Sequence, residues 1–120
     1  MTQPNRFQQL VADAKARITE ISAADAQAEA ARGAAVLLDV RETSEWQQGH
    51  AAGAQHLSRG VIEVEIEDAI PDVNQPIIVY CGGGSRSALT ADSLQKMGYK
   101  NVRSLAGGMR AWRDAGLPVE

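Results

Sequence analysis

The feature that most constrains the fold is a pair of continuous apolar runs, "AVLLDV" at residues 35–40 and "PIIVYC" at residues 76–81. A strand with one face in water alternates apolar and polar side chains, whereas a strand covered on both faces is apolar throughout. Both runs therefore predict buried strands. Strand and helix signals alternate along the chain, which is typical of a parallel sheet with helices on both faces.

Weaker patterns predict the remaining elements. We expect further short strands in "ITEI" (18–21), "AQHLS" and "NVRSL". We expect helices between Ser22 and Gly33, in "SEWQQ" with Ser44 and Gln47 as a capping box, over about 86–97, and in "GGMRAWRDAG". The segment "GVIEVEIEDAI" has the alternation of a strand, but we favour a helix that ends before Pro71.

The N-terminal segment is predicted to be a helical extension. Its apolar residues fall at helical spacings of three and four, namely Phe7, Leu10, Val11, Ala14 and Ile18. We expect residues 1–17 to form this extension, packed on the body or on another subunit, and residues 18–120 to form the domain.

Composition excludes several classes of protein. The 120 residues suffice for one domain with its own core. The net charge is −3 and no Lys/Arg block is interleaved with aromatics, so we expect no nucleic acid partner. The apolar runs are too short to span a membrane, and the N-terminus lacks the apolar stretch of a secretory signal. A single cysteine forms no internal disulfide or Cys-rich zinc site, so we expect a cytoplasmic protein without metal or cofactor.

The only cysteine, Cys81, stands where the predicted strand 76–81 ends and a helix begins, in "YCGGGSRSALTADSL". Ligands of open α/β sheets bind at this end of the strands. The three glycines allow the backbone N–H groups to curl inward as an anion-binding nest, and the helix N-terminus adds positive potential. We therefore expect an activated thiolate, bound by Gly82, Gly83, Gly84, Ser85, Arg86 and Ser87.

Four interpretations of Cys81 compete. It could be a buried structural cysteine, or the nucleophile of a Cys-His hydrolase with His50 or His56 as base. A cysteine phosphatase needs five residues between cysteine and arginine, and here there are four. The missing residue shortens the loop by about 3.8 Å, or ~1 Å of ring diameter. A narrower ring suits a single sulfur atom better than a phosphoryl group, which favours sulfur transfer through a persulfide.

The chain resembles the small single-domain members of the rhodanese family. The resemblance rests on "LLDVRETSEWQQGHAAGA" (37–54), "IIVYCGGGSRSALTADSLQKMGYKNV" (77–102) and "LAGGMRAWRDAGLPV" (105–119). It implies an open parallel five-stranded sheet, a persulfide on Cys81 and a six-residue loop from Cys81 to Arg86 around the sulfur. It also implies that Asp39 and Arg41 support the site, although a plain ion pair at a strand end explains them equally well. Glu45 is expected to pair with an arginine near the loop.

The sequence thus predicts a sulfurtransferase with Cys81 as nucleophile. Its partner would be a small sulfur-containing anion, such as thiosulfate, or a protein persulfide or thiol. Many family members carry a basic or polar residue directly after the cysteine, where this chain has Gly82, and the open mouth favours a protein-borne partner. The alternative from another class is a non-catalytic sulfide- or protein-binding module, and an arsenate reductase or phosphatase is the alternative among enzymes. Both a monomer and a homodimer are compatible with the sequence.

Overall fold

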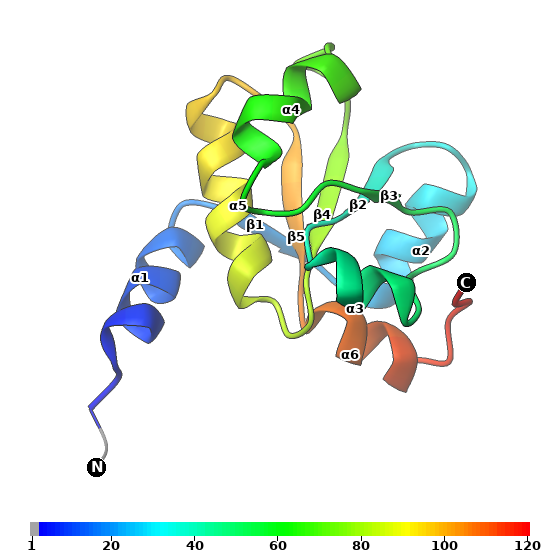
Figure 1. Ribbon diagram of the computed structural model, residues 1–120, viewed down its shortest axis with the longest axis horizontal. Coiled ribbons are helices and arrows are strands. Elements are labelled where there is room, and N and C mark those ends of the chain that lie inside the picture. Colours follow the sequence, from blue (N-terminus) through cyan, green and yellow to red (C-terminus); the bar gives the residue numbers. More distant parts are fainter. Residues whose placement is uncertain (1–2) are drawn as a thin grey trace.

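Strand β4 (Ile77–Tyr80) lies at the centre of a five-stranded parallel sheet of order β1-β5-β4-β2-β3. The structure is a computed structural model that describes residues 3–120, and its arrangement is shown in Figure 1. The other strands are β1 (Thr19–Ile21), β2 (Val36–Asp39), β3 (Gln55–His56) and β5 (Val102–Leu105). The predicted α/β fold, an open parallel five-stranded sheet flanked by helices, is confirmed.

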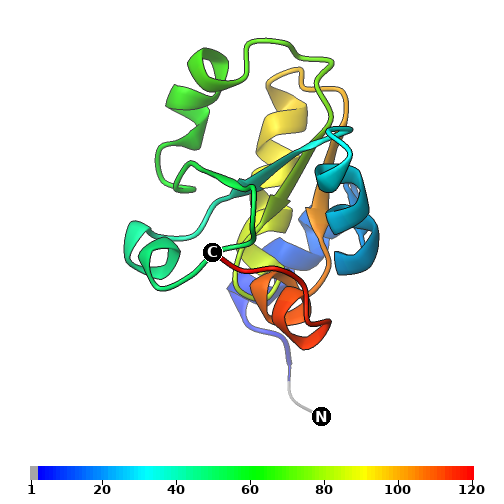
Figure 2. The same ribbon diagram turned by 90° about the vertical axis from the view of Figure 1, so that its right-hand side faces the viewer.

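Helices connect the strands and cover the sheet. They are α1 (Arg6–Lys15), α2 (Ala23–Ala31), α3 (Thr43–Gln47), α4 (Ile62–Ala69), α5 (Ser85–Lys96) and α6 (Gly108–Asp114). Figure 2 shows α2 and α6 on one side of the sheet and α4 on the other. Within residues 3–120, no helix has the length and apolar character needed to cross a membrane.

The apolar run of β4 is explained by two separate cores. Successive side chains of a strand point to opposite faces. Ile77 and Val79 pack in the core under α4 and α5. Ile78 and Tyr80 pack in the core under α2 and α6, where Trp112 is also buried. All four residues of β4 are therefore buried, as a strand covered on both faces requires.

The ambiguous segment after residue 60 is a helix, as favoured. Ile62 and Ile66 lie one turn apart and are fully buried, whereas Val64 between them is 83% exposed. A strand, in which burial alternates from residue to residue, would have buried Val64 and Ile66 together. The i, i+4 spacing of the isoleucines therefore outweighs the strand-like pattern.

The predicted capping box of α3 is wrong in register. The helix begins at Thr43 with Glu42 as its N-cap, and the backbone N–H of Glu42 donates to Glu45 Oε1 at 3.1 Å. Ser44 lies inside the helix and Gln47 is its last residue. A glutamate at the third helical position satisfies the cap N–H as well as a glutamine does, so two overlapping boxes were available in this segment.

Helix α1 is held on α5 by apolar contact and by one ion pair. Val11 and Ala14 are buried against Ala88 and Leu89 of α5. Arg17 donates two hydrogen bonds to the carboxylate of Asp92, at 3.0 and 2.8 Å, and lowers the pKa of that carboxyl to about 2. The described part of the predicted extension thus packs on the body. Residues 1–2 lie outside the described residues, and the division at residue 17 stays a prediction.

Ala14→Glu should lower the free energy of unfolding by about 2–4 kcal/mol, because a carboxylate would be forced against the apolar side chains of α5. Ala12→Glu is the matched control, since Ala12 is exposed on the same helix and the charge change is the same. We expect the control to change stability by less than about 0.5 kcal/mol in urea unfolding. Equal unfolding midpoints for the two variants would show that α1 is not docked.

Candidate active site

Cys81 directly follows β4, and α5 begins four residues later at Ser85. The thiol therefore sits at the carboxyl end of the central strand, in the turn between β4 and α5, which is in the lower half of Figure 1. Its side chain is 1% exposed. The order of elements at this point, a buried strand followed by a glycine turn and a helix, is the one the sequence predicted.

Three polar groups surround the sulfur atom. The backbone N–H of Gly84 donates to Cys81 Sγ at 3.1 Å, and the N–H of Ser87 donates at 3.4 Å. Ser87 Oγ lies 3.5 Å from Sγ. Gly84 has a φ of +103°, and a Cβ there would lie 3.3 Å from the backbone nitrogen of Gly107. Gly84 thus needs to be glycine for both its conformation and its surroundings.

The environment lowers the pKa of the Cys81 thiol below its ordinary value. Burial alone would raise it, because desolvation penalises the thiolate. The hydroxyl of Ser87 and the backbone N–H groups of Ser87, Gly84 and Gly83 together outweigh burial. The N-terminus of α5, a helix of 12 residues, points its positive end at the same atom. These groups stabilise the thiolate, the reactive form of a cysteine.

The remaining predicted loop residues take different places. Ser85 is the first residue of α5. Arg86 turns away toward α3, where its Nη1 and Nη2 donate to the two carboxylate oxygens of Glu45 at 2.9 and 3.1 Å. The expected pairing of Glu45 with an arginine near the loop is thereby confirmed. Gly82 lacks a positive φ, and a Cβ there would meet only Arg86 Nη2, at 3.6 Å. Its backbone would therefore accept a side chain.

Ser104 is a site residue that the sequence analysis missed. Its Oγ lies 2.8 Å from Ser87 Oγ, and both serines are fully buried. Ser104 comes from β5, the neighbour of β4. A serine inside an otherwise buried strand could have indicated such a contact, since buried hydroxyls need a hydrogen-bond partner.

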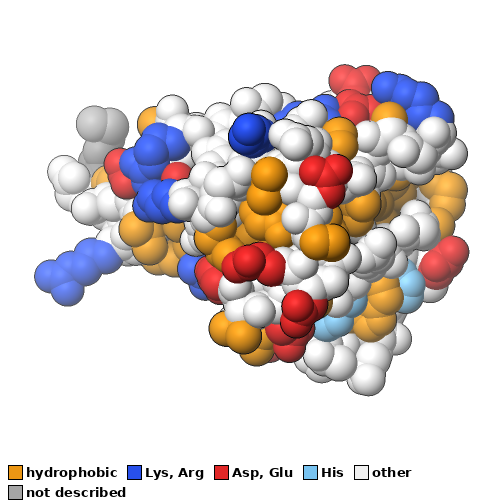
Figure 3. All heavy atoms as spheres, turned by 90° about the horizontal axis from the view of Figure 1, so that it is seen from above, with side chains coloured by type: hydrophobic (Ala, Val, Ile, Leu, Met, Phe, Trp, Pro, Cys, Tyr) orange, Lys and Arg blue, Asp and Glu red, His pale blue; other side chains and the backbone are white. Residues whose placement is uncertain are grey.

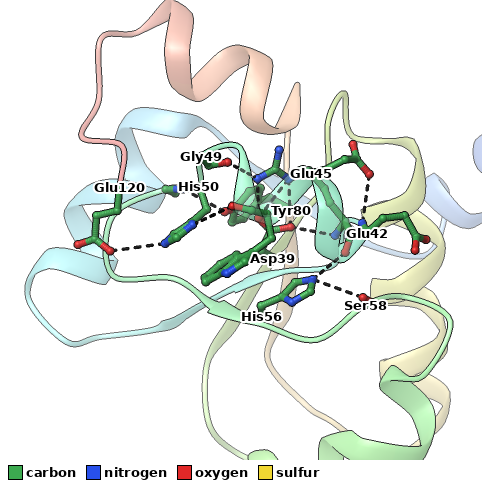
Figure 4. A network of polar contacts seen from close by, with 12 residues as sticks. Asp39, Glu42, Glu45, Gly49, His50, His56, Ser58, Tyr80 and Glu120 are labelled. Atoms are coloured by element: carbon green, nitrogen blue, oxygen red, sulfur yellow. Dashed lines mark hydrogen bonds and ion pairs between the residues drawn. The ribbon is translucent and has the colours of Figure 1, made fainter.

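Asp39 and Arg41 form a buried ion pair at the end of β2. Arg41 Nη2 donates to Asp39 Oδ2 at 2.8 Å and to the carbonyl of Gly49 at 2.7 Å. The hydroxyl of Tyr80 accepts from the backbone N–H of Ala51 at 3.1 Å, and its pKa is raised by burial and by Asp39. Figure 4 shows this network joining the strand ends to the segment after α3. Its contacts stiffen the strand end, and a direct role at the sulfur stays a prediction.

Both histidines are engaged away from the thiol. His50 Nδ1 lies 3.2 Å from the carbonyl of Trp46, and its Nε2 lies 3.6 Å from Glu120 (Figure 4). His56 Nε2 lies 2.8 Å from the carbonyl of Arg41. Both rings stack on Trp46, at 3.5 and 5.0 Å between centroids. These contacts give the imidazoles structural partners and do not favour a Cys-His hydrolase.

Helix α6 holds the loop from the side opposite the sulfur. The N–H of Met109 donates to the carbonyl of Cys81 at 2.7 Å, and the N–H of Arg110 donates to the carbonyl of Gly82 at 3.1 Å. Gly108 has a φ of +55°, and a Cβ there would overlap the Cys81 carbonyl oxygen and lie 2.8 Å from the Gly82 carbonyl carbon. In the sequence, the double glycine of "LAGGMRAW" is the feature that could have predicted this close approach.

A hollow of about 380 Å³ lies between α3 and α6, the two helices that contact the loop. It is lined by Arg41, Glu45, Gln48, Met109, Arg110 and Arg113. A larger hollow of about 550 Å³ lies between α2, β2 and the C-terminal tail, and its lining has no titratable side chain. Among residues 3–120, no three His, Cys, Asp or Glu side chains are grouped to hold a metal ion.

Comparison with known proteins gives one family. Residues 22–115 match the rhodanese-like domain. The chain is 42% identical to the thiosulfate sulfurtransferase GlpE of Actinobacillus succinogenes over 72% of its own length and 76% of the relative. A Rhodopseudomonas palustris protein described as a possible tyrosine phosphatase superposes with a TM-score of 0.89, at 33% identity, covering 100% of this chain and 98% of that one. The polysulfide-sulfur transferase homodimer of Wolinella succinogenes gives 0.82, at 30% identity, covering 95% and 86%.

Alkylation of Cys81 should report a pKa below the ordinary thiol value of about 8.5. The rate should therefore stay high as the pH falls through that value, and drop only at a lower pH. Ser87→Ala should raise the inflection by about one to two pH units, because a hydrogen bond to a charged group contributes roughly 1.5–3 kcal/mol. Ser104→Ala, which removes only the partner of Ser87, should raise it less. A wild-type inflection at or above the ordinary value would contradict an activated thiolate.

Gly108→Ala should lower the free energy of unfolding by about 2–4 kcal/mol and slow Cys81 alkylation, because the new methyl group collides with the loop backbone. Gly116→Ala is the control, since Gly116 also has a positive φ, +70°, but has free space around its Cβ position. We expect Gly116→Ala to lower the free energy of unfolding by about 1–2 kcal/mol and to leave the alkylation rate unchanged. Urea unfolding measures the free energy of unfolding, and thiol labelling quenched at timed intervals measures the rate of Cys81 alkylation. Equal effects of the two variants would refute the close approach of α6.

Proposed function

The chain belongs to the rhodanese-like family and is a sulfurtransferase, and we propose that it carries the transferred sulfur as a persulfide on Cys81. One observation carries the proposal. The sulfur of Cys81 receives hydrogen bonds from the N–H groups of Gly84 and Ser87 at the N-terminus of α5. Donors fixed in this way stabilise negative charge on sulfur before and after the transfer.

The proposed reaction has two displacements. The Cys81 thiolate attacks the outer sulfur of the donor, and the bond between that sulfur and the rest of the donor breaks. The leaving group departs with the bonding electron pair, as sulfite if the donor is thiosulfate. An acceptor thiolate or cyanide then attacks the outer sulfur of the persulfide, and the electron pair of the S–S bond returns to Cys81 Sγ.

The chain's own groups have separate tasks in this scheme. Gly83, Gly84 and Ser87 hold the charge, as their effect on the thiol pKa indicates. Arg86 keeps Glu45 paired beside the loop. The loop mouth at Gly82 and Gly83 has no side chains, so the outer sulfur would be reachable by a small anion or by a partner protein carrying a thiol or persulfide.

A phosphatase activity is disfavoured by the same loop. Four residues separate Cys81 from Arg86, and both terminal nitrogens of Arg86 are bonded to Glu45. That arginine is therefore turned away from the position where phosphoryl oxygens would need it. A non-catalytic binding module is the other alternative, and the lowered pKa of Cys81 favours catalysis over it.

Treatment with thiosulfate without reductant should add the mass of one sulfur atom to the protein, and cyanide should remove it with release of thiocyanate. Cys81→Ser should gain no sulfur and form thiocyanate only at the rate of the buffer, because it lacks the nucleophile. Circular dichroism checks that this variant is folded. Thiocyanate formation by the folded serine variant would refute the mechanism. Cys81-dependent cleavage of an aryl phosphate, with no sulfur gain, would favour the phosphatase instead.

A further inference from the structure

The hollow of about 380 Å³ is built by α3 and α6, two helices from different parts of the chain. Arg110 and Arg113 stand three residues apart in α6, and therefore lie on one side of that helix. Glu45 of α3 and Gln48 after it form the other wall. Arg113 Nη2 lies 3.0 Å from where a Cβ of Gly49 would be, so its side chain folds against the segment after α3.

The hollow has an excess of positive charge. Arg41 is neutralised by Asp39, and Glu45 by Arg86. In the described range 3–120, no carboxylate lies within ion-pair distance of Arg110 or Arg113. Two guanidinium groups thus remain uncompensated in a chain whose net charge is −3.

Much of the negative charge lies elsewhere. The exposed side of α4 carries four acidic residues around the exposed Val64, namely Glu63, Glu65, Glu67 and Asp68. Figure 3 looks onto the top of the molecule as Figure 1 draws it, and shows acidic side chains next to apolar ones there. Helix α6, which carries Arg110 and Arg113, lies in the lower half of Figure 1, whereas α4 lies at its top. The acidic residues of α4 and the two arginines of α6 therefore lie at different ends of the molecule.

The hollow is also tied to the reaction centre. Met109 and Arg110, which line it, donate their backbone N–H groups to the carbonyls of Cys81 and Gly82. Glu45 lines it and holds Arg86 of the loop. A molecule seated in the hollow would thus contact the two helices, α3 and α6, that hold the Cys81 loop in place.

We propose that this hollow is a subsite for the carboxylate of a low-molecular-weight thiol that accepts sulfur from Cys81, with Arg110 and Arg113 as its specificity-determining residues. The inference rests on the proposed function and adds the chemical class of acceptor. Guanidinium forks match the planar geometry of carboxylates and bind them bidentately. A volume of about 380 Å³ is within the range of small-molecule sites, and exceeds what a sulfur atom already held by the loop requires.

The step balances without a further reactant. The acceptor binds with its carboxylate on the two arginines and its thiolate at the loop mouth. The thiolate attacks the outer sulfur of the Cys81 persulfide, one S–S bond forms and one breaks. The acceptor leaves as a persulfide anion, and Cys81 returns to the thiolate.

The test isolates this second step. Protein already carrying sulfur on Cys81 is mixed with 3-mercaptopropionate or with 2-mercaptoethanol, which are of similar size and differ in the carboxylate. Loss of the persulfide is followed by intact mass in a single turnover. The ratio of the two rate constants is compared among variants, so that the intrinsic reactivities of the thiols cancel.

We expect Arg110→Gln/Arg113→Gln to lower this ratio about five- to tenfold at low salt, because two cations facing the carboxylate are lost. High salt should lower the wild-type ratio and leave the double variant nearly unchanged. Lys100→Gln is the control, since it removes one exposed positive charge just before the amino end of β5, at the opposite end of the strands from Cys81. Its ratio should match the wild type.

A ratio that is unchanged in the double variant would overturn the subsite. An equal fall in Lys100→Gln would also overturn it, because the effect would then be one of net charge. If neither thiosulfate nor a low-molecular-weight persulfide deposits sulfur on Cys81, the proposed function itself has failed, and the acceptor subsite fails with it. These results are distinguishable in the same mass spectra.

Discussion

The hydrogen bonds from α6 to the carbonyls of Cys81 and Gly82 are the constraint on which the site depends. In a planar trans peptide the C=O and N–H groups point in opposite directions. Fixing these two carbonyls on α6 therefore turns the N–H groups of Gly82 and Gly83 to the other side of the loop. The orientation of Gly83, one of the groups that lower the pKa of Cys81, is thus set from the outer side of the loop, and Gly108 is required there because any Cβ would push the carbonyls away.

The parallel sheet supplies the partners for this arrangement. β5 lies beside β4, so its carboxyl end reaches the same edge as Cys81. Ser104 near that end meets Ser87, and the chain continues directly into the double glycine and α6. On the other side β2 brings the Asp39–Arg41 pair to the same edge. Elements remote in sequence therefore converge because their strands run in the same direction.

The sequence was sufficient for features that are encoded locally. The apolar run 76–81, the glycine turn and the following helix predicted β4, Cys81 and α5 without knowledge of other segments. Ser104 and the backbone donors of α6 could not be assigned in this way, because their role depends on which strand lies next to β4. The direction of the Arg86 side chain depended likewise on Glu45, which is 41 residues away. Only the register of α3 was wrong for a local reason, since two capping patterns overlap there.

The paired hydroxyls of Ser87 and Ser104 have a consequence for how the site responds to charge. Each hydroxyl hydrogen can rotate about its C–O bond without moving any heavy atom. When Cys81 is a thiolate, Ser104 can donate to Ser87 and Ser87 to the sulfur, and when it is a thiol both hydrogens can turn the other way. The two serines therefore act as a small buried dipole that reorients with the charge on sulfur. In this sense the core next to the nucleophile is polarisable, although its packing is rigid.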